Sequence, residues 1–279
     1  MAEKGLSELM LTDDRLDGLF DSHAHYFDRR FSEETEGADH ILKNEVFGKG
    51  IDGVINIGTN SRTSVLCVEQ AARYTKMYAT VGLHPEDIAF CKDSVSDELL
   101  RIQELLSNKC ENKIVAIGEI GLDYHYEGFD KTLQIKCFED QLDLAKQLDM
   151  PVVIHDRDAH GDCFDVILRH SGVRGVFHSF SGSAEMAIEL VKRGWYISFS
   201  GVLTFKNARK AVEAAEAIPL DKILIETDCP YLAPHPFRGR INHSGLMCYT
   251  AQKLAEIKNT SYREAVSATR KNVYELFGV

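Results

Sequence analysis

Short apolar runs alternate with amphipathic helical patterns along almost the whole 279-residue chain, and this alternation constrains the fold most. Each run is short enough for one buried strand, and the segments between runs repeat their apolar residues at helical spacing. The predicted strands are residues 18–25, 53–59, 78–84, 113–121, 151–155, 174–180, 195–200 and 223–228. The predicted helices between them are residues 64–75, 97–106, 131–148, 163–170, 184–193 and 205–217.

Strands that alternate with helices in this number predict the α/β class and a (β/α)₈ TIM barrel, whose active site lies at the C-terminal ends of the strands. A doubly wound open sheet is the alternative, but it favours fewer strands and a glycine-rich phosphate loop after the first. The first strand here ends in His23-Ala24-His25 instead. Residues 245–258 and 261–277 predict further helices, so the barrel is expected to carry an extra C-terminal helix. We predict one barrel domain over residues 18–279, preceded by an N-terminal extension over residues 1–17.

The composition excludes several classes of protein. A formal net charge of −11 argues against a protein that coats nucleic acid through a basic surface, while local binding of phosphates through metal ions stays open. The seven cysteines are scattered without a C-x-x-C pair, which indicates reduced thiols and a cytoplasmic location. No run approaches the roughly 18 apolar residues of a membrane span. The acidic residues 1–17 are unlike a secretory signal.

Six polar side chains stand where predicted strands end. His23 and His25 lie two positions apart, so both imidazoles share one face of the first strand. The other four each follow an apolar run of their own: Glu119, His155, His178 and Asp228. Taken singly, each has a common structural role as a hydrogen-bonded histidine or a helix cap. Burying all of them at one barrel mouth is costly without a compensating cation, so the set predicts a site for two metal ions.

Further motifs in the chain resemble those of the TatD-type metal-dependent deoxyribonucleases of the amidohydrolase superfamily. The matching motifs are DSHAH at 21–25, GLHP at 82–85, GEIGLDY at 118–124, PVVIH at 151–155, HSFSG at 178–182 and ETDCPYLAP at 226–234. They follow the family's order across almost the whole chain. The resemblance implies a TIM barrel with two divalent metal ions and cleavage of phosphodiester bonds in DNA.

The resemblance also implies roles for these residues. It divides the metal ligands into two sets: His23, His25 and Asp228 for one ion, His155 and His178 for the other, with Glu119 bridging both. The ions would activate a water molecule as nucleophile, and Asp228 would accept its proton. Asp228, Glu119 and His84 are therefore the expected catalytic residues, with His84 near the substrate phosphate. Imidazole ligands favour Zn²⁺ or Mn²⁺, whereas phosphoryl chemistry often uses Mg²⁺, so the identity of the metal stays open.

Substrate contacts are expected from Arg238, Phe180 and Glu226, although Glu226 could instead orient a ligand histidine. Basic residues of the predicted strand-to-helix loops could bind a few phosphates: Arg29, Arg30, Arg157, Lys206, Arg238 and Arg240. Aromatic neighbours could stack on bases or wall the pocket: Tyr26, Tyr124, Phe180, Phe205 and Tyr231. A narrow mouth favours a strand end over an intact duplex, so we expect a 3′-exonuclease acting on single-stranded or frayed DNA. We expect a monomer.

One loop departs from the family pattern. Residues 240–244 read Arg-Ile-Asn-His-Ser, where the family usually has Lys or Arg, then Arg-Asn-Glu-Pro. An amidohydrolase-type esterase or amidase, such as a D-aminoacyl-tRNA deacylase, is therefore an alternative function. A catalytically idle binding protein is another, but such a protein usually loses a metal ligand. Cys229 next to Asp228 is interpreted as a packing residue.

Overall fold

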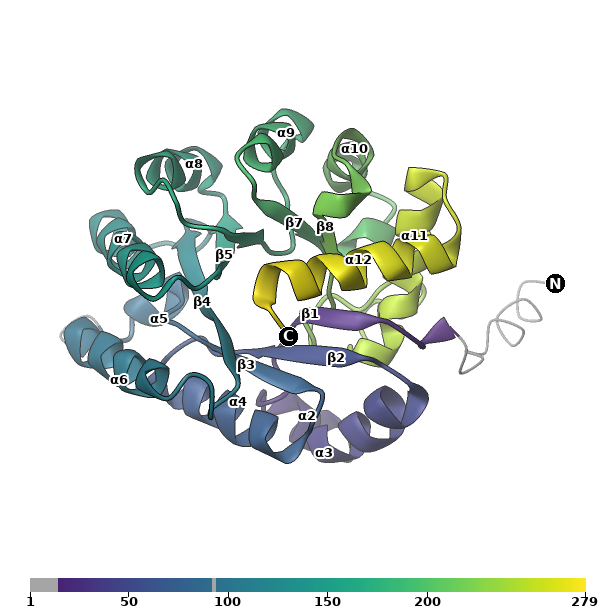
Figure 1. Ribbon diagram of the computed structural model, residues 1–279, viewed down its shortest axis with the longest axis horizontal. Coiled ribbons are helices and arrows are strands. Elements are labelled where there is room, and N and C mark those ends of the chain that lie inside the picture. Colours follow the sequence, from purple (N-terminus) through teal and green to yellow (C-terminus); the bar gives the residue numbers. More distant parts are fainter. Residues whose placement is uncertain (1–14, 92–93) are drawn as a thin grey trace.

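The computed structural model describes residues 15–91 and 94–279. Eight strands form one sheet in the order β1 to β8, and each strand pairs in parallel with the next. The strands are β1 (Phe20–Ala24), β2 (Gly53–Ile57), β3 (Met77–Val81), β4 (Ile114–Asp123), β5 (Val152–Arg157), β6 (Gly175–Phe177), β7 (Tyr196–Phe199) and β8 (Ile223–Ile225). This arrangement confirms the predicted (β/α)₈ barrel (Figure 1).

The barrel closes where the chain leaves β8 and passes β1. Ala24 forms an isolated parallel bridge with Cys229. The amide of His25 donates to the carbonyl of Cys229 at 2.8 Å, and the amide of Asp228 donates to the carbonyl of His23 at 2.9 Å. This backbone seam places Asp228 beside both histidines of the first strand.

Helices surround the strands (Figure 1). They are α2 (Arg30–Glu34), α3 (Ala38–Ile41), α4 (Ser61–Arg73), α5 (Pro85–Ile88), α6 (Val95–Ser107), α7 (Lys131–Leu148), α8 (His160–Arg169), α9 (Ala184–Lys192), α10 (Arg209–Ala217), α11 (Met247–Lys258) and α12 (Tyr262–Phe277). Local sequence accounts for their bounds. The side chain of Asp130 accepts from the Leu133 amide at the start of α7, and Asp149 ends that helix in the left-handed region at φ 47°.

The last helix, α12, covers the end of the barrel opposite the polar strand ends. Val273, Leu276 and Phe277 pack with interior side chains such as Phe20 and Leu224. Asn272 donates from Nδ2 to the carbonyl of Ile223, the first residue of β8, at 2.8 Å. Figure 1 shows α12 lying across this end of the ring of strands. The predicted extra C-terminal helix therefore caps the barrel.

Some predicted boundaries were wrong by a few residues. β4 and β5 run on to Asp123 and Arg157, past the predicted ends at 121 and 155, because these last residues still pair across the ladder. The predicted strand at 174–180 ends at Phe177, since the chain turns at Ser179 with φ 40°. The predicted helix at 205–217 begins only at Arg209. Residues 201–204 before it form a short 3₁₀ turn, in which the Val202 amide donates to the side chain of Ser200.

The N-terminal extension is described only at its end. Residues 1–14 of the predicted extension lie outside the described residues. The guanidinium of Arg15 donates to Gln252 at 2.9 Å, and Leu16 is buried in the core. Within 15–91 and 94–279, none of the helices combines the length and apolar character that crossing a membrane requires.

Candidate metal centre

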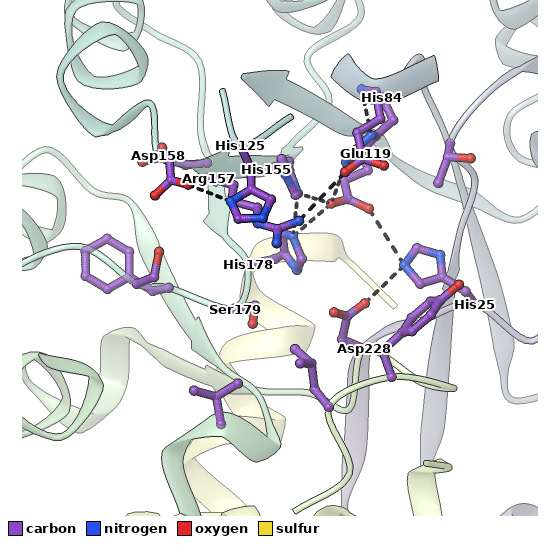
Figure 2. A pocket seen from close by; sticks show the side chains of 18 of the residues that line it. His25, His84, Glu119, His125, His155, Arg157, Asp158, His178, Ser179 and Asp228 are labelled. Atoms are coloured by element: carbon purple, nitrogen blue, oxygen red, sulfur yellow. Dashed lines mark hydrogen bonds and ion pairs between the residues drawn. The ribbon is translucent and has the colours of Figure 1, made fainter. Parts of the chain in front are cut away.

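The predicted ligands meet at the C-terminal end of the barrel. A cavity of about 1100 Å³ opens there, and its wall includes His25, Glu119, His155, His178 and Asp228. His23 lies just beneath, fully buried. Figure 2 shows Glu119 between His25 on one side and His155 and His178 on the other. Side chains from β1, β4, β5 and the residues following β6 and β8 thus converge on one point.

The carboxylate of Glu119 is shared between two groups of histidines. Its Oε1 lies 2.8 Å from both His155 Nδ1 and His178 Nε2. Its Oε2 lies 3.3 Å from His23 Nε2 and 3.7 Å from His25 Nε2. One carboxylate oxygen therefore faces each group, which is the arrangement that a bridging ligand requires.

Asp228 belongs to the group of His23 and His25. Its Oδ1 lies 3.2 Å from His25 Nε2 and 3.8 Å from His23 Nε2. The two imidazole nitrogens are themselves only 3.0 Å apart. Three ligand atoms from one strand and the closing seam of the barrel therefore surround a single point.

Hydrogen bonds on the far side of three imidazoles set their orientation. His25 Nδ1 donates to the carbonyl of Ile57 at 2.9 Å. His155 Nε2 donates to Asp123 at 2.9 Å, and His178 Nδ1 lies 3.3 Å from Glu226. With the proton on each outer nitrogen, the inner nitrogen turns a lone pair toward the centre, as metal-binding histidines do.

Close packing of β4 against β5 brings Glu119 and Asp123 to His155. Gly121 lies between the two acids at φ 143°, and a Cβ there would be 2.0 Å from the carbonyl oxygen of His155. Only glycine permits this approach. The second glycine of the GEIGLD motif is therefore required to place both carboxylates on opposite nitrogens of one imidazole.

The buried charges shift one another's pKa values. Burial raises the pKa of Glu119, but His178, His84 and His23 outweigh burial and hold the pKa well below its usual range. Burial lowers the pKa of His155, yet hydrogen bonds to Asp123 and Glu119 raise it to about 9. The pKa of Asp228 is likewise lowered because His25 and His23 outweigh its burial. The negative potential that holds protons on the imidazoles also attracts metal cations.

The donor set fits two divalent cations. Three groups of side chains have ligand atoms close enough together to hold an ion. One group is His23, His25 and Asp228. The two others both include Glu119, which is joined by His23 and His178 in one and by His84 and His155 in the other. Mixed imidazole and carboxylate ligands suit Zn²⁺ and Mn²⁺ and leave room for exchangeable positions. The six predicted ligands are thus brought together at one end of the barrel.

His84 faces the same centre through a different tautomer. Its Nδ1 accepts the Glu86 amide at 3.1 Å and so caps α5. The proton of a neutral His84 is then on Nε2, which lies 3.4 Å from Glu119 Oε1. In this tautomer His84 presents an N–H donor to the cavity, so it does not complete a metal site with Glu119 and His155.

The three predicted substrate contacts have different positions. Phe180 lines the cavity. Glu226 is 1% exposed and does not line it, because its Oε1 accepts the Ser179 amide at 2.7 Å behind His178. Its position favours the orienting role. Arg238 lies outside the cavity wall, with its guanidinium 4.2 Å from the ring centroid of Phe205.

Cys229 is fully buried and its thiol pKa is raised by burial, as a packing residue requires.

Two acids that contribute to the site were not predicted. Asp123 lies four residues after Glu119, on the same face of β4, and this period-2 spacing was the available signal. Asp21 is fully buried and accepts from the Thr227 amide and hydroxyl at 3.0 and 2.6 Å, and from Ser244 at 2.7 Å. It holds the closing seam beneath the metal ligands.

Comparisons with known proteins agree with this centre. Residues 20–278 match the family described as TatD related DNase. The uncharacterized metal-dependent hydrolase YabD of Bacillus subtilis is 39% identical over 94% of this chain and 99% of its own. The uncharacterized metal-dependent hydrolase YcfH of Escherichia coli is 32% identical over 94% and 96%. The crystal structure of YJJV, a TatD homologue from E. coli, superposes with a TM-score of 0.86 at 28% identity, over 95% of this chain and 99% of that one.

The barrel, the strand-end ligands and these relatives define a metal-dependent hydrolase with a (β/α)₈ barrel fold. Within that class, the chain belongs to the TatD family.

Proposed function

We propose that this hydrolase cleaves phosphodiester bonds in DNA and removes nucleotides from the 3′ end of single-stranded or frayed DNA. The division of the Glu119 oxygens between two groups of histidines carries the proposal. Such a division suits two cations held side by side by one carboxylate. Two divalent cations held by these residues would supply an activated water and neutralise the charge of a phosphodiester. The family description supports DNA as the substrate.

Residues of the chain would divide the work around the phosphate. Asp228, whose carboxyl is held ionised by His25 and His23, would accept the proton of the attacking water. His84 would donate from Nε2 to a phosphate oxygen, where negative charge grows in the transition state. Phe180 would wall the site against the sugar or base.

The size of the cavity supports a strand end as the substrate, and the free thiols support a cytoplasmic location. A volume of about 1100 Å³ is slightly above the roughly 1,000 Å³ to which small-molecule pockets run, so a terminal nucleotide and its neighbour fit better than a compact metabolite. All seven cysteines are free, five of them buried, which supports a reducing compartment such as the cytoplasm.

Digestion of a 5′-labelled single-stranded oligonucleotide tests the proposal. Wild-type protein loaded with Mg²⁺ or Mn²⁺ is expected to give a ladder that shortens from the 3′ end. Glu119→Ala removes the shared carboxylate and is expected to reduce the rate by roughly 10³-fold or more, because both ions lose a ligand. Glu104→Ala on the exposed face of α6 is the matched control and should keep full activity.

Two outcomes would overturn the proposal. An oligonucleotide left intact with Mg²⁺, Mn²⁺ and Zn²⁺ would exclude this nuclease activity and favour the ester alternative, which an aminoacyl-RNA substrate would then test. Cleavage that survives in Glu119→Ala at the wild-type rate would show that another site performs it.

A further inference from the structure

Charge is distributed unevenly around the cavity mouth. On the side of β1, β3 and β5, the cavity wall carries five carboxylates besides the ligands: Asp28, Glu86, Asp87, Asp156 and Asp158. On the side of β7, it carries Arg209 and Lys210 at the start of α10. Apart from the ligand Asp228, the cavity wall formed by the residues that follow β7 and β8 thus carries cations and no carboxylate.

Two loops make up this second side. Residues 200–210, after β7, contain Lys206, Arg209 and Lys210 and neither Asp nor Glu. Residues 229–243, after β8, contain Arg238 and Arg240 and again neither acid. We call residues 200–210 and 229–243 together the basic rim. In Figure 1 the elements that bear it, β7, α10 and β8, lie next to one another.

Direct contacts hold the two loops of the basic rim together. The amide of His235 donates to Thr204 Oγ1 at 2.7 Å. A Cβ on Gly201 would lie 2.1 Å from the carbonyl oxygen of Leu232, so the two backbones touch at this glycine. The guanidinium of Arg238 stacks on Phe205 from the other loop. The two loops that carry these cations therefore lie against each other and form one continuous surface.

Most cations of the basic rim have no carboxylate partner. Of the ion pairs among residues 15–91 and 94–279, none involves Lys206, Lys210, Arg238 or Arg240, whereas Arg209 pairs with Glu213 at 2.7 Å. Elsewhere at this end of the barrel, Arg30 pairs with Glu34 at 2.9 Å and Arg157 approaches Glu86 at 3.9 Å. A phosphate bound at the basic rim would not have to displace a carboxylate.

We propose that the basic rim is the track along which the rest of the substrate strand leaves the metal centre. Lys206, Lys210, Arg238 and Arg240 would contact phosphates that are not being cleaved. The carboxylates of the opposite side would repel the strand and so select this path. The proposal rests on the proposed function, because it assumes that the scissile bond belongs to a polynucleotide.

A double charge reversal tests the track. Lys206→Glu with Lys210→Glu changes the charge by −4, and Lys146→Glu with Arg263→Glu makes the same change at the other end of the barrel, on α7 and α12. All variants are studied as metal-loaded protein. The substrates are a 12-nucleotide strand and a small diester, bis(p-nitrophenyl) phosphate.

For the rim variant we expect kcat/KM on the 12-nucleotide strand to fall about tenfold or more, with kcat on the small diester unchanged within about twofold. The affinity of the rim variant for the strand should depend less on salt than that of wild type. Each lost phosphate contact makes the plot of log affinity against log salt less steep, by about 0.7 for a single strand. The control variant should behave as wild type. Three results would overturn the track. The rim variant could lose activity equally on the strand and on the small diester, the control variant could lose as much activity on the strand as the rim variant, or the rim variant could lose no activity on the strand.

Binding of a cleavage-resistant phosphorothioate 12-nucleotide strand, followed by fluorescence anisotropy, separates the two proposals. Cleavage of DNA with unchanged binding in the rim variant overturns the track and leaves the nuclease. Binding that weakens only in the rim variant, without cleavage of any DNA, supports the track and overturns the nuclease. Absence of both binding and cleavage overturns both.

Discussion

For three of the four ligand histidines, an outer hydrogen bond decides which ring nitrogen is free for a metal. Ile57, Asp123 and Glu226 provide this partner for His25, His155 and His178. Two of these partners are carboxylates, which also raise the basicity of the imidazole they touch. Metal affinity therefore depends on acids that do not themselves reach the centre.

Asp123→Asn tests this dependence. The substitution keeps an oxygen for the His155 N–H but removes the negative charge. We expect affinity for one of the two ions to fall about 10–100-fold, as is usual when such a partner is lost. The measurement is metal bound per chain in competition with a chelator of known affinity.

Asp165→Asn, on the exposed face of α8, is the control for this substitution and should bind metal with the affinity of wild type. Circular dichroism should show the same fold in both variants. Unchanged affinity in Asp123→Asn would mean that the charge on Asp123 does not support His155.

Single residues could be predicted where a motif marks a strand end. His23, His25, Glu119, His155 and His178 all end apolar runs. The role of Asp123 could not be predicted, because its contact with His155 depends on the register that pairs Gly121 with His155. The position of Glu226 behind His178 depends in the same way on how the ends of β6 and β8 meet.

At the scale of the element, helix starts are set by local hydrogen bonds. Ser261 and Glu264 form a capping box at the start of α12, in which each side chain accepts the other residue's backbone amide. Hydrogen bonds from Thr260 and Ser261 lower the pKa of Glu264 from its ordinary 4.5 to about 2. The cap thus depends on an ionised carboxylate.

Glu264→Gln should therefore destabilise the protein only where Glu264 is ionised. Because the pKa is lower in the folded chain than in the unfolded chain, the stabilising contribution is complete above about pH 5. It is lost as the pH falls from 4.5 toward 2. Urea midpoints of wild type and variant should differ at pH 7 and converge on acidification, and a pH-independent difference would contradict this account.

At the scale of the whole molecule, the two ends of the barrel have separate tasks. The C-terminal end carries the metal centre, and α12 covers the other end with an apolar face. Tyr274 of α12 donates to Asp52, just before β2, at 2.7 Å. Packing of α12 therefore stabilises the ring of strands at the end of the barrel that lies away from the metal centre.

Leu276→Ala tests this separation. Leu276 is 3% exposed within the cluster at the covered end, so truncation should cost about 2–5 kcal/mol of unfolding free energy. Leu168→Ala, which truncates a leucine that is 45% exposed on α8, should cost within about 0.5 kcal/mol. Urea denaturation measures both. A loss of metal-dependent activity in Leu276→Ala under conditions where it is fully folded would contradict the separation.

The sequence by itself determined the class of fold and the chemistry of the metal ligands. Periodicity requires only neighbouring residues, and a ligand type is a property of its side chain, so both are visible in the sequence. The family motifs also placed the candidate ligands at strand ends that meet in the structure. The predicted ends of β4, β5, β6 and α10 were less reliable, because ladder pairing and turns depend on neighbouring segments.

Only the tertiary structure decided how charge and hydrogen bonds are shared among distant segments. It divides the oxygens of Glu119 between two groups of histidines, and it turns His84 into a donor. It also joins residues 200–210 to residues 229–243, so that cations far apart in the chain form one surface in a protein of net charge −11. The physical reason is that these properties depend on distances of a few ångströms between strand ends, which barrel closure sets and local sequence does not.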